Sequence, residues 1–176
     1  MRLGNLMSRE VDGEFQANFR TNGFMNRLKA FAAVGCFDVG ALDTKVEFSA
    51  IDYTAKAIVL LAGTPDQFTV FHVNSCHTVH MANVLHAMNR NGINIDIVDE
   101  QEYQSAFESA MQDEKRNMAV SNLISYNTHD TAQQPIDLDN SFTVKALYRL
   151  GFSWPIVSED YIERSVRMLL QLGFFE

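Results

Sequence analysis

The sequence has little cysteine, little proline and no long apolar run, and each shortage excludes a class of protein. Its two cysteines, Cys36 and Cys76, cannot build the disulfide framework of a small secreted domain and are typical of a reducing compartment. With 3 prolines, 9 glycines and 47% hydrophobic residues, the chain is neither collagen-like nor disordered. No segment approaches the roughly 18 apolar residues of a membrane span, and no signal-peptide-like stretch follows Met1. These features predict a cytoplasmic globular protein with no membrane partner.

Basic residues are also in deficit, because 14 Lys and Arg stand against 22 Asp and Glu, for a net charge of −8. An acidic surface repels phosphate backbones, so we expect no nucleic-acid partner. The segment from Asp96 to Glu114 carries seven carboxylates and no Lys or Arg. We interpret it as a solvated helix face, with docking of a basic partner as the alternative. The length favours a single unit over residues 1–176.

The motifs of several enzyme classes are missing. The sequence contains no Gly-rich dinucleotide motif or P-loop, no nucleophile elbow G-x-S-x-G and no zinc-protease motif H-E-x-x-H. Tyr53 and Lys56 are the residue types of the short-chain dehydrogenase acid pair, in which the Lys lowers the phenol pKa. That pair reads Tyr-x-x-x-Lys, however, whereas only two residues intervene here. We therefore predict no catalytic residue in this chain.

One cluster contains soft metal ligands, namely Cys76, His77, His80 and His86. A zinc site needs three or four ligands at a recognised spacing, which this cluster lacks. We predict no metal site and interpret these residues as the polar start of a helix. A metal-binding domain built on them is the weakest alternative.

Helix signals outnumber strand signals. Capping residues and apolar periodicity predict helices at 22–34 after Asn22, at 55–62 after Asp52 or Thr54, after Thr78, after Asp99, from Thr143 and after Ser158. Runs of β-formers predict strands at 2–7, 46–48, 68–73 and 93–97, and a polar loop at 125–140. The alternation of strands and helices indicates an α/β fold. A chain with so few strands, beginning inside one of them, resembles the second half of a larger fold.

Polar and turn-forming residues crowd among aromatics near the N-terminus. They are Gly4, Asn5, Arg9, Asp12, Gly13, Gln16, Asn18 and Asn22. Such a density can line a substrate pocket, and it can equally form a turn and a helix cap.

Several short sequence segments are more informative about function. Together they resemble the second half of thioester reductase domains, which end many nonribosomal peptide synthetases. These domains are extended short-chain dehydrogenases, related to the reductase part of carboxylic acid reductases. The segments are R-L-G-N-L at 2–6, D-G-E-F-Q-A-N at 12–18, N-G-F at 22–24, V-E-F-S-A-I-D-Y-T-A-K-A-I at 46–58, F-H-V-N at 71–74, D-N-S at 139–141, L-G-F at 150–152 and W-P at 154–155. The resemblance extends over essentially all 176 residues.

The resemblance implies a helix-rich α/β fold, namely the C-terminal portion of an extended short-chain dehydrogenase (Rossmann-type) fold without its N-terminal nucleotide-binding half. The family binds NADPH and reduces a thioester held on the phosphopantetheine arm of a carrier protein to an aldehyde or alcohol. By resemblance, Gly4, Asn5 and Leu6 would pass close to the nicotinamide. The substrate channel would be lined by Phe15, Gln16, Asn18, Asn22, Phe24 and Met25.

The leading interpretation is therefore the substrate-binding portion of such a reductase, with a carrier protein and the nucleotide-binding half as partners. Since nucleotide binds at strands that this chain does not contain, we expect no tight NADPH binding and no activity from the chain alone. The alternative is a non-catalytic module that binds a carrier protein or another partner.

Overall fold

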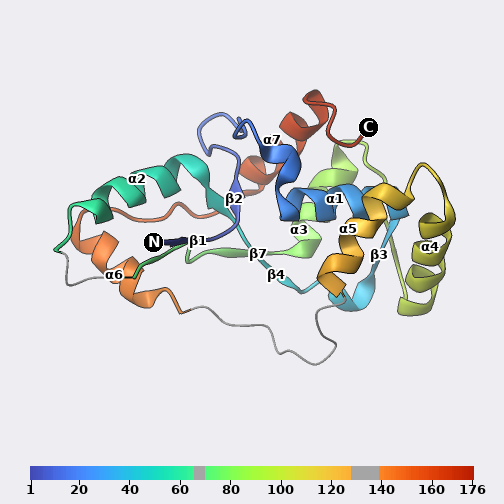
Figure 1. The fold of residues 1–176 in the computed structure, drawn as a ribbon, viewed down its shortest axis with the longest axis horizontal. Coiled ribbons are helices and arrows are strands. Elements are labelled where there is room, and N and C mark those ends of the chain that lie inside the picture. The colour runs from blue at the N-terminus through green and yellow to red at the C-terminus, as the bar shows by residue number, and fades with distance from the viewer. Residues whose placement is uncertain (66–69, 128–138) are drawn as a thin grey trace.

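The protein is a helix-rich α/β structure, as predicted, and its computed structural model describes residues 1–65, 70–127 and 139–176 (Figure 1). The α-helices are α1 (Gly23–Val34), α2 (Ile51–Ala62), α3 (Met81–Arg90), α4 (Glu100–Gln112), α5 (Asn117–Asn127), α6 (Ser141–Arg149) and α7 (Glu159–Gln171). Two 3-10 turns are η1 (Phe19–Thr21) and η2 (Val39–Ala41). None of the helices in these ranges is long and apolar enough to cross a membrane.

The strands of the described residues form four separate pairs. They are β1 (Arg2–Leu3), β2 (Leu6–Met7), β3 (Cys36–Asp38), β4 (Lys45–Glu47), β5 (Ser49–Ala50), β6 (His72–Val73), β7 (Thr78–His80) and β8 (Asp96–Val98). Three pairs are parallel, β1 with β6, β2 with β5 and β3 with β8, whereas β4 and β7 are antiparallel. In Figure 1, β4 and β7 run through the middle of the molecule, between the α2/α6 end and the end that carries α1, α3, α4 and α5.

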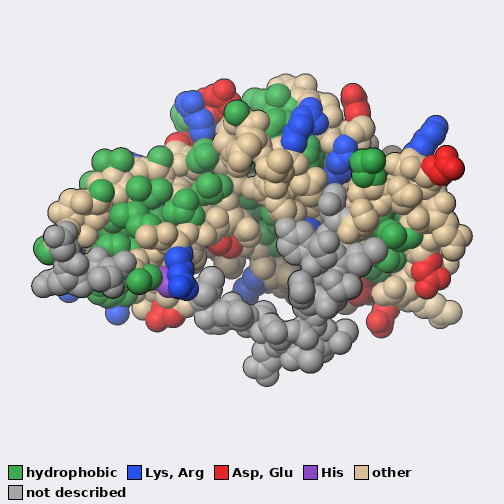
Figure 2. Space-filling view, in the orientation of Figure 1, with side chains coloured by type: hydrophobic (Ala, Val, Ile, Leu, Met, Phe, Trp, Pro, Cys, Tyr) green, Lys and Arg blue, Asp and Glu red, His purple; other side chains and the backbone are tan. Residues whose placement is uncertain are grey.

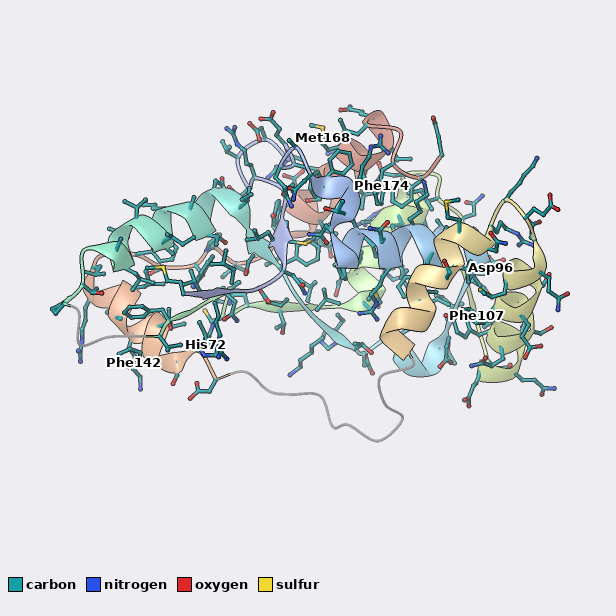
Figure 3. All side chains as sticks on the ribbon, viewed as in Figure 1. His72, Asp96, Phe107, Phe142, Met168 and Phe174 are labelled. Atoms are coloured by element: carbon teal, nitrogen blue, oxygen red, sulfur yellow. The ribbon has the colours of Figure 1, made fainter. Side chains whose placement is uncertain are left out.

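Two hydrophobic clusters form the core. The larger one is built around α1, α3 and α7 and includes Met25, Leu28 and Met88, all almost completely buried. The smaller one lies between α2, α6 and β6, with Leu61, Leu147 and Trp154 among its members. In Figure 3, His72 and Phe142 lie at the α6 end of the molecule, and Asp96 and Phe107 lie at the opposite end, near α4.

Three helix starts are confirmed, and each has a side-chain cap. The side chain of Asn22 accepts the Met25 amide hydrogen at 3.1 Å and begins α1. Equivalent caps begin α4, where Asp99 accepts from the Glu102 amide at 2.9 Å, and α7, where Ser158 accepts from an amide at 3.1 Å. These bonds satisfy donors that the first turn of a helix leaves unpaired.

The predicted starts of three other helices were wrong, because these helices begin without a side-chain cap. The second helix begins at Ile51, and Thr54 lies inside it, where its hydroxyl donates to the Ala50 carbonyl at 2.9 Å. Thr78 lies in β7, and α3 follows only at residue 81. Thr143 lies inside α6, where its hydroxyl accepts the His72 amide at 3.0 Å. A Thr that binds a neighbouring carbonyl or strand looks like a cap in sequence.

The strand and loop predictions need similar correction. The strand expected at 2–7 is interrupted at Gly4 and Asn5, and the one expected at 93–97 begins only at Asp96. Of the strand expected at 68–73, residues 72–73 form β6, while 66–69 lie outside the described residues. The loop expected from residue 125 overlaps the end of α5, a helix that was not predicted, and 128–138 lie outside the description.

One buried hydrogen bond attaches α7 to the chain that follows β2. The hydroxyl of Tyr161 donates to the carbonyl oxygen of Ser8 at 2.7 Å, and both residues are buried. The Ser8 and Ser165 hydroxyls are 2.6 Å apart in the same place. The ring of Tyr161 also packs edge-on against Phe48, with centroids 6.0 Å apart.

We expect Tyr161→Phe to lower the free energy of unfolding by about 0.5–1.5 kcal/mol, because the Ser8 carbonyl would lose its shorter hydrogen bond and keep only the one from the Ile51 amide at 3.4 Å. Urea denaturation measures this change. The matched control is Tyr148→Phe on the exposed side of α6, for which we expect a change within about 0.5 kcal/mol. Equal effects of the two variants would contradict the assignment.

Candidate functional site

An open cavity of about 590 Å³ lies where the link between β1 and β2 meets η1 and the start of α1. Its lining residues are Gly4, Asn5, Leu6, Gln16, Asn18, Thr21, Asn22, Gly23, Phe24, Arg27 and Ile51. A concave site of this size, with polar groups beside an apolar wall, suits a small-molecule ligand.

Asn22 joins the two walls of this cavity. While its side-chain oxygen caps α1, its side-chain nitrogen donates to the carbonyl oxygen of Leu6 at 3.0 Å. The start of α1 is thus fixed against β2. Both halves of the Asn22 amide are therefore used by the fold.

Glu47 holds the opposite wall. Its Oε2 accepts the amide hydrogen of Asn5 at 3.1 Å, and the Asn5 carbonyl accepts from the Ser49 amide at 3.2 Å. Gly4 completes the turn, since its amide donates to the Val73 carbonyl at 3.3 Å. The Gly4–Asn5 link is thus held by hydrogen bonds to Glu47 and Ser49 on one side and to Val73 on the other.

No side chain fits at Gly4. A Cβ there would collide with the Glu47 carboxylate and lie 2.6 Å from the Cβ of Asn74. The close approach of this carboxylate to the backbone therefore requires glycine at this position.

Ser49 extends the network to a third segment. Its hydroxyl donates to Oε1 of Glu47, and its Oγ accepts the Ser75 amide hydrogen at 2.8 Å. Ser49 and Ser75 are both buried. One carboxylate and one hydroxyl thereby join the β1–β2, β4–β5 and β6–β7 connections.

Burial raises the pKa of Glu47, although the hydrogen bonds from Ser49 and Asn5 lower it in part. A buried carboxyl group prefers its neutral form, whereas hydrogen-bond donors favour the ionised form. Desolvation is the larger of the two effects here.

The cavity wall is mostly neutral and rich in carboxamides. Asn5, Gln16 and Asn18 contribute such groups, and Arg27 is the ionisable side chain among the described lining residues. Arg27 also packs over the Phe31 ring, with its guanidinium carbon 5.9 Å from the ring centroid. The wall can therefore form hydrogen bonds with a neutral polar ligand.

The structure brings together seven of the nine residues that the resemblance assigned to cofactor or substrate. They are Gly4, Asn5, Leu6, Gln16, Asn18, Asn22 and Phe24. Phe15 instead lines a neighbouring hollow of about 420 Å³ with Phe19 and Met168. Met25 lies fully buried in the larger core cluster, because it faces a different side of α1 from the cavity-lining residues.

Sequence reasoning missed Arg27 and Glu47. Helical spacing could have found Arg27, which is four residues after Gly23 and so shares its face of α1. Besides its local bond with Ser49, Glu47 contacts Asn5, and no local pattern indicates that contact because the two residues are 42 positions apart.

The other sequence candidates do not assemble into a site. In the described parts of the chain, no group of three His, Cys, Asp or Glu residues could hold a metal ion. His80 instead contacts the Asp43 carbonyl at 3.1 Å. Tyr53, in the first turn of α2, packs its ring 6.1 Å from that of Phe152.

No protein-family model matches the sequence, and no curated protein matches it either. Solved structures do match. A thiolation-reductase di-domain from an archaeal non-ribosomal peptide synthetase is 32% identical with a TM-score of 0.84, over 99% of this chain and 36% of that one.

Two more distant structures share the fold. The reductase domain of the aureusimine biosynthetic cluster has 24% identity and a TM-score of 0.77, and the terminal R domain of the myxalamid PKS-NRPS pathway has 20% and 0.76. Each match covers 98% of this chain, but it covers only 44% of the aureusimine reductase domain and 43% of the myxalamid R domain. The chain thus spans between about a third and a half of the structures it matches.

Replacement of the partly buried Glu47 carboxyl group should make stability less dependent on pH. Because the pKa of Glu47 is raised on folding, its contribution is fully present below the ordinary Glu pKa and is lost as pH rises through the folded value. We therefore expect Glu47→Gln to gain stability relative to the wild type as pH rises from about 4 to about 7. Thermal unfolding across this range measures the difference.

The control for this prediction is Glu108→Gln on the exposed surface of α4. Its stability should follow that of the wild type at every pH. A constant difference between Glu47→Gln and the wild type would show that the carboxyl group does not titrate differently on folding.

Proposed function

Because this chain corresponds to the C-terminal portion of a reductase domain of the nonribosomal peptide synthetase type, we propose that it forms the substrate-binding portion of an NADPH-dependent thioester reductase. The reaction releases an acyl or peptidyl group from the phosphopantetheine arm of a carrier protein as an aldehyde, or as an alcohol after a second reduction. The observation that carries the proposal is the 590 Å³ cavity, on a fold shared with the archaeal protein over 99% of this chain.

The proposed roles follow from the two walls of the cavity. NADPH would supply the hydride, and the Gly4–Leu6 turn would lie beside its nicotinamide. Asn5 and Leu6 line the open side of this turn, which fits such a ligand, while Glu47 holds its backbone from behind. Gln16, Asn18 and the other residues of the opposite wall would contact the thioester substrate.

Exposed apolar surface supports a partner at the α2 end of the molecule. Within the described residues β1 pairs with β6 alone, so its other edge has no strand beside it. Leu3 on this edge is 47% exposed, and Val59 on the outer side of α2 is 73% exposed. Figure 2 shows hydrophobic side chains gathered over this end. An open edge beside apolar side chains suits the docking of a nucleotide-binding half.

The alternative is a non-catalytic module that binds a carrier protein. It is favoured by one observation, namely that the 176 residues contain neither a Gly-rich loop nor a Tyr-x-x-x-Lys pair. The two functions differ in what happens when a nucleotide-binding half is supplied.

We expect the chain alone to bind NADPH weakly or not at all, because it lacks the Gly-rich turn that holds the pyrophosphate. Titration of NADPH fluorescence measures this binding. Tight binding at a ratio of one to one would contradict the expectation.

A chimera tests the function itself. In the archaeal thiolation-reductase protein, this chain would replace the portion that it matches. The folded chimera, checked by circular dichroism, should oxidise NADPH when the carrier is loaded with a thioester. A folded chimera that binds NADPH and the loaded carrier without oxidising NADPH would favour the non-catalytic module.

A further inference from the structure

We propose that a second ligand site lies between α6 and the end of α2, and that it binds a small carboxylate with an apolar body. The site combines two stacked aromatic rings, those of Phe71 and Phe142, with two cations one helical turn apart, Lys145 and Arg149. None of its lining residues lines the 590 Å³ cavity, so the inference does not rest on the proposed function.

The site is a hollow of about 360 Å³ at the α6 end of the molecule, where Figure 3 shows Phe142. We call it the α6 hollow, and its lining residues are Thr64, Phe71, Phe142, Lys145, Ala146, Arg149 and Leu150. The rings of Phe71 and Phe142 stack with their centroids 5.9 Å apart and 19° between their planes. The volume lies within the range of small-molecule sites, and the floor of the hollow is apolar.

The sequence of α6 puts these residues on one face. Phe142, Ala146 and Leu150 recur every four positions, and each of the two cations comes one position before an apolar residue of this row. Positions three and four apart lie on the same side of a helix, so the cations flank the apolar row. Phe142 is 53% exposed and Leu150 is 42% exposed. The face therefore leaves apolar surface in water that a ligand could cover.

Lys145 and Arg149 have no anion bound to them within the described residues. Neither side chain forms a hydrogen bond or an ion pair with any of these residues. Hydrogen bonding by Ser141 and, to a smaller extent, the charge of Lys145 lower the pKa of Asp139, yet no ion pair joins Asp139 to Lys145. Like charges four residues apart on a helix repel each other. A bound anion would remove this repulsion.

The apolar floor and the two cations together define the class of ligand. The Arg149 guanidinium can donate two parallel hydrogen bonds to a carboxylate, and the Lys145 ammonium can donate another. An apolar body attached to this carboxylate would cover Phe142 and Leu150. A neutral apolar molecule would leave the cations unpaired, and a small hydrophilic anion would leave the floor in water. A carboxylate with an apolar body satisfies both parts of the hollow.

Three small molecules separate these contributions. Octanoate has the carboxylate and the apolar body, octanamide has a similar body with a neutral head, and acetate has the carboxylate without the body. Titration of each against the full chain, followed by saturation-transfer NMR, measures its affinity. We expect octanoate to bind about 5-fold more tightly than octanamide, because ion pairs at exposed sites contribute modestly. Acetate should show no saturable binding. The preference for octanoate should shrink as ionic strength rises from about 0.02 M to about 0.5 M, because salt screens exposed charges.

Substitutions in the α6 hollow test its position. The double variant Lys145→Gln/Arg149→Gln should bind octanoate about 5-fold more weakly than the wild type does and octanamide equally well. Phe142→Ala should weaken the binding of both molecules about 3-fold, because each loses apolar contact. The matched control is Lys45→Gln/Arg167→Gln, which removes two exposed positive charges from β4 and α7. This control should bind both molecules as the wild type does.

Stability distinguishes a ligand site from a pair of cations that serves the fold. Because the double variant Lys145→Gln/Arg149→Gln removes a repulsion within α6, its melting temperature should equal or slightly exceed that of the wild type. A marked fall would show that the two cations stabilise the fold, and it would overturn the proposal.

Binding results would also overturn the proposal. If octanoate does not bind, or binds no better than octanamide, the carboxylate class is wrong. If octanoate binds and the double variant keeps the full affinity, the ligand lies elsewhere and the α6 hollow is not its site. Each of these outcomes leaves the proposed function standing, because the two sites share no lining residue.

Discussion

The hydrogen bond from the Asn5 amide to Glu47 is the contact on which the arrangement of this molecule depends. Through it and the adjoining Ser49 hydroxyl, three chain connections that are distant in sequence meet at one point. This point lies between the two hydrophobic clusters, where β1 pairs with β6 on one side and β2 with β5 on the other. The absence of a side chain at Gly4 allows the carboxylate to approach so closely.

The junction of Asn5, Glu47 and Ser49 also supports one wall of the cavity, so the fold itself sets the geometry of the site. The other wall depends on Asn22, which caps α1 and also bonds to Leu6. Polar residues around the cavity thus divide into two groups. Some, such as Asn22, use their hydrogen bonds to hold the walls together, whereas the buried Oε1 of Gln16 has no hydrogen-bond partner among the described residues.

Local signals in the sequence predicted the elements that depend on local bonds. Helices capped by Asn22, Asp99 and Ser158 were found at their first residue, because the capping bond spans only three positions. The helices without such caps were displaced, and α5, which lies against α1, was missed. Most cavity residues were named through the family resemblance. Glu47, which holds one wall of the cavity from behind, was not named as a site residue, because no local pattern indicates its contact with Asn5 across 42 positions.

Tyr53 contacts both hydrophobic clusters, although it is only partly buried. Its place in the first turn of α2 puts it directly after the β5 strand that the Glu47 junction holds. A residue shared by two clusters makes their packing energies interdependent, so mutations placed in different clusters are not expected to act additively when both touch it. The residue that looked in sequence like half of an acid pair thus links the cooperativity of the two cores.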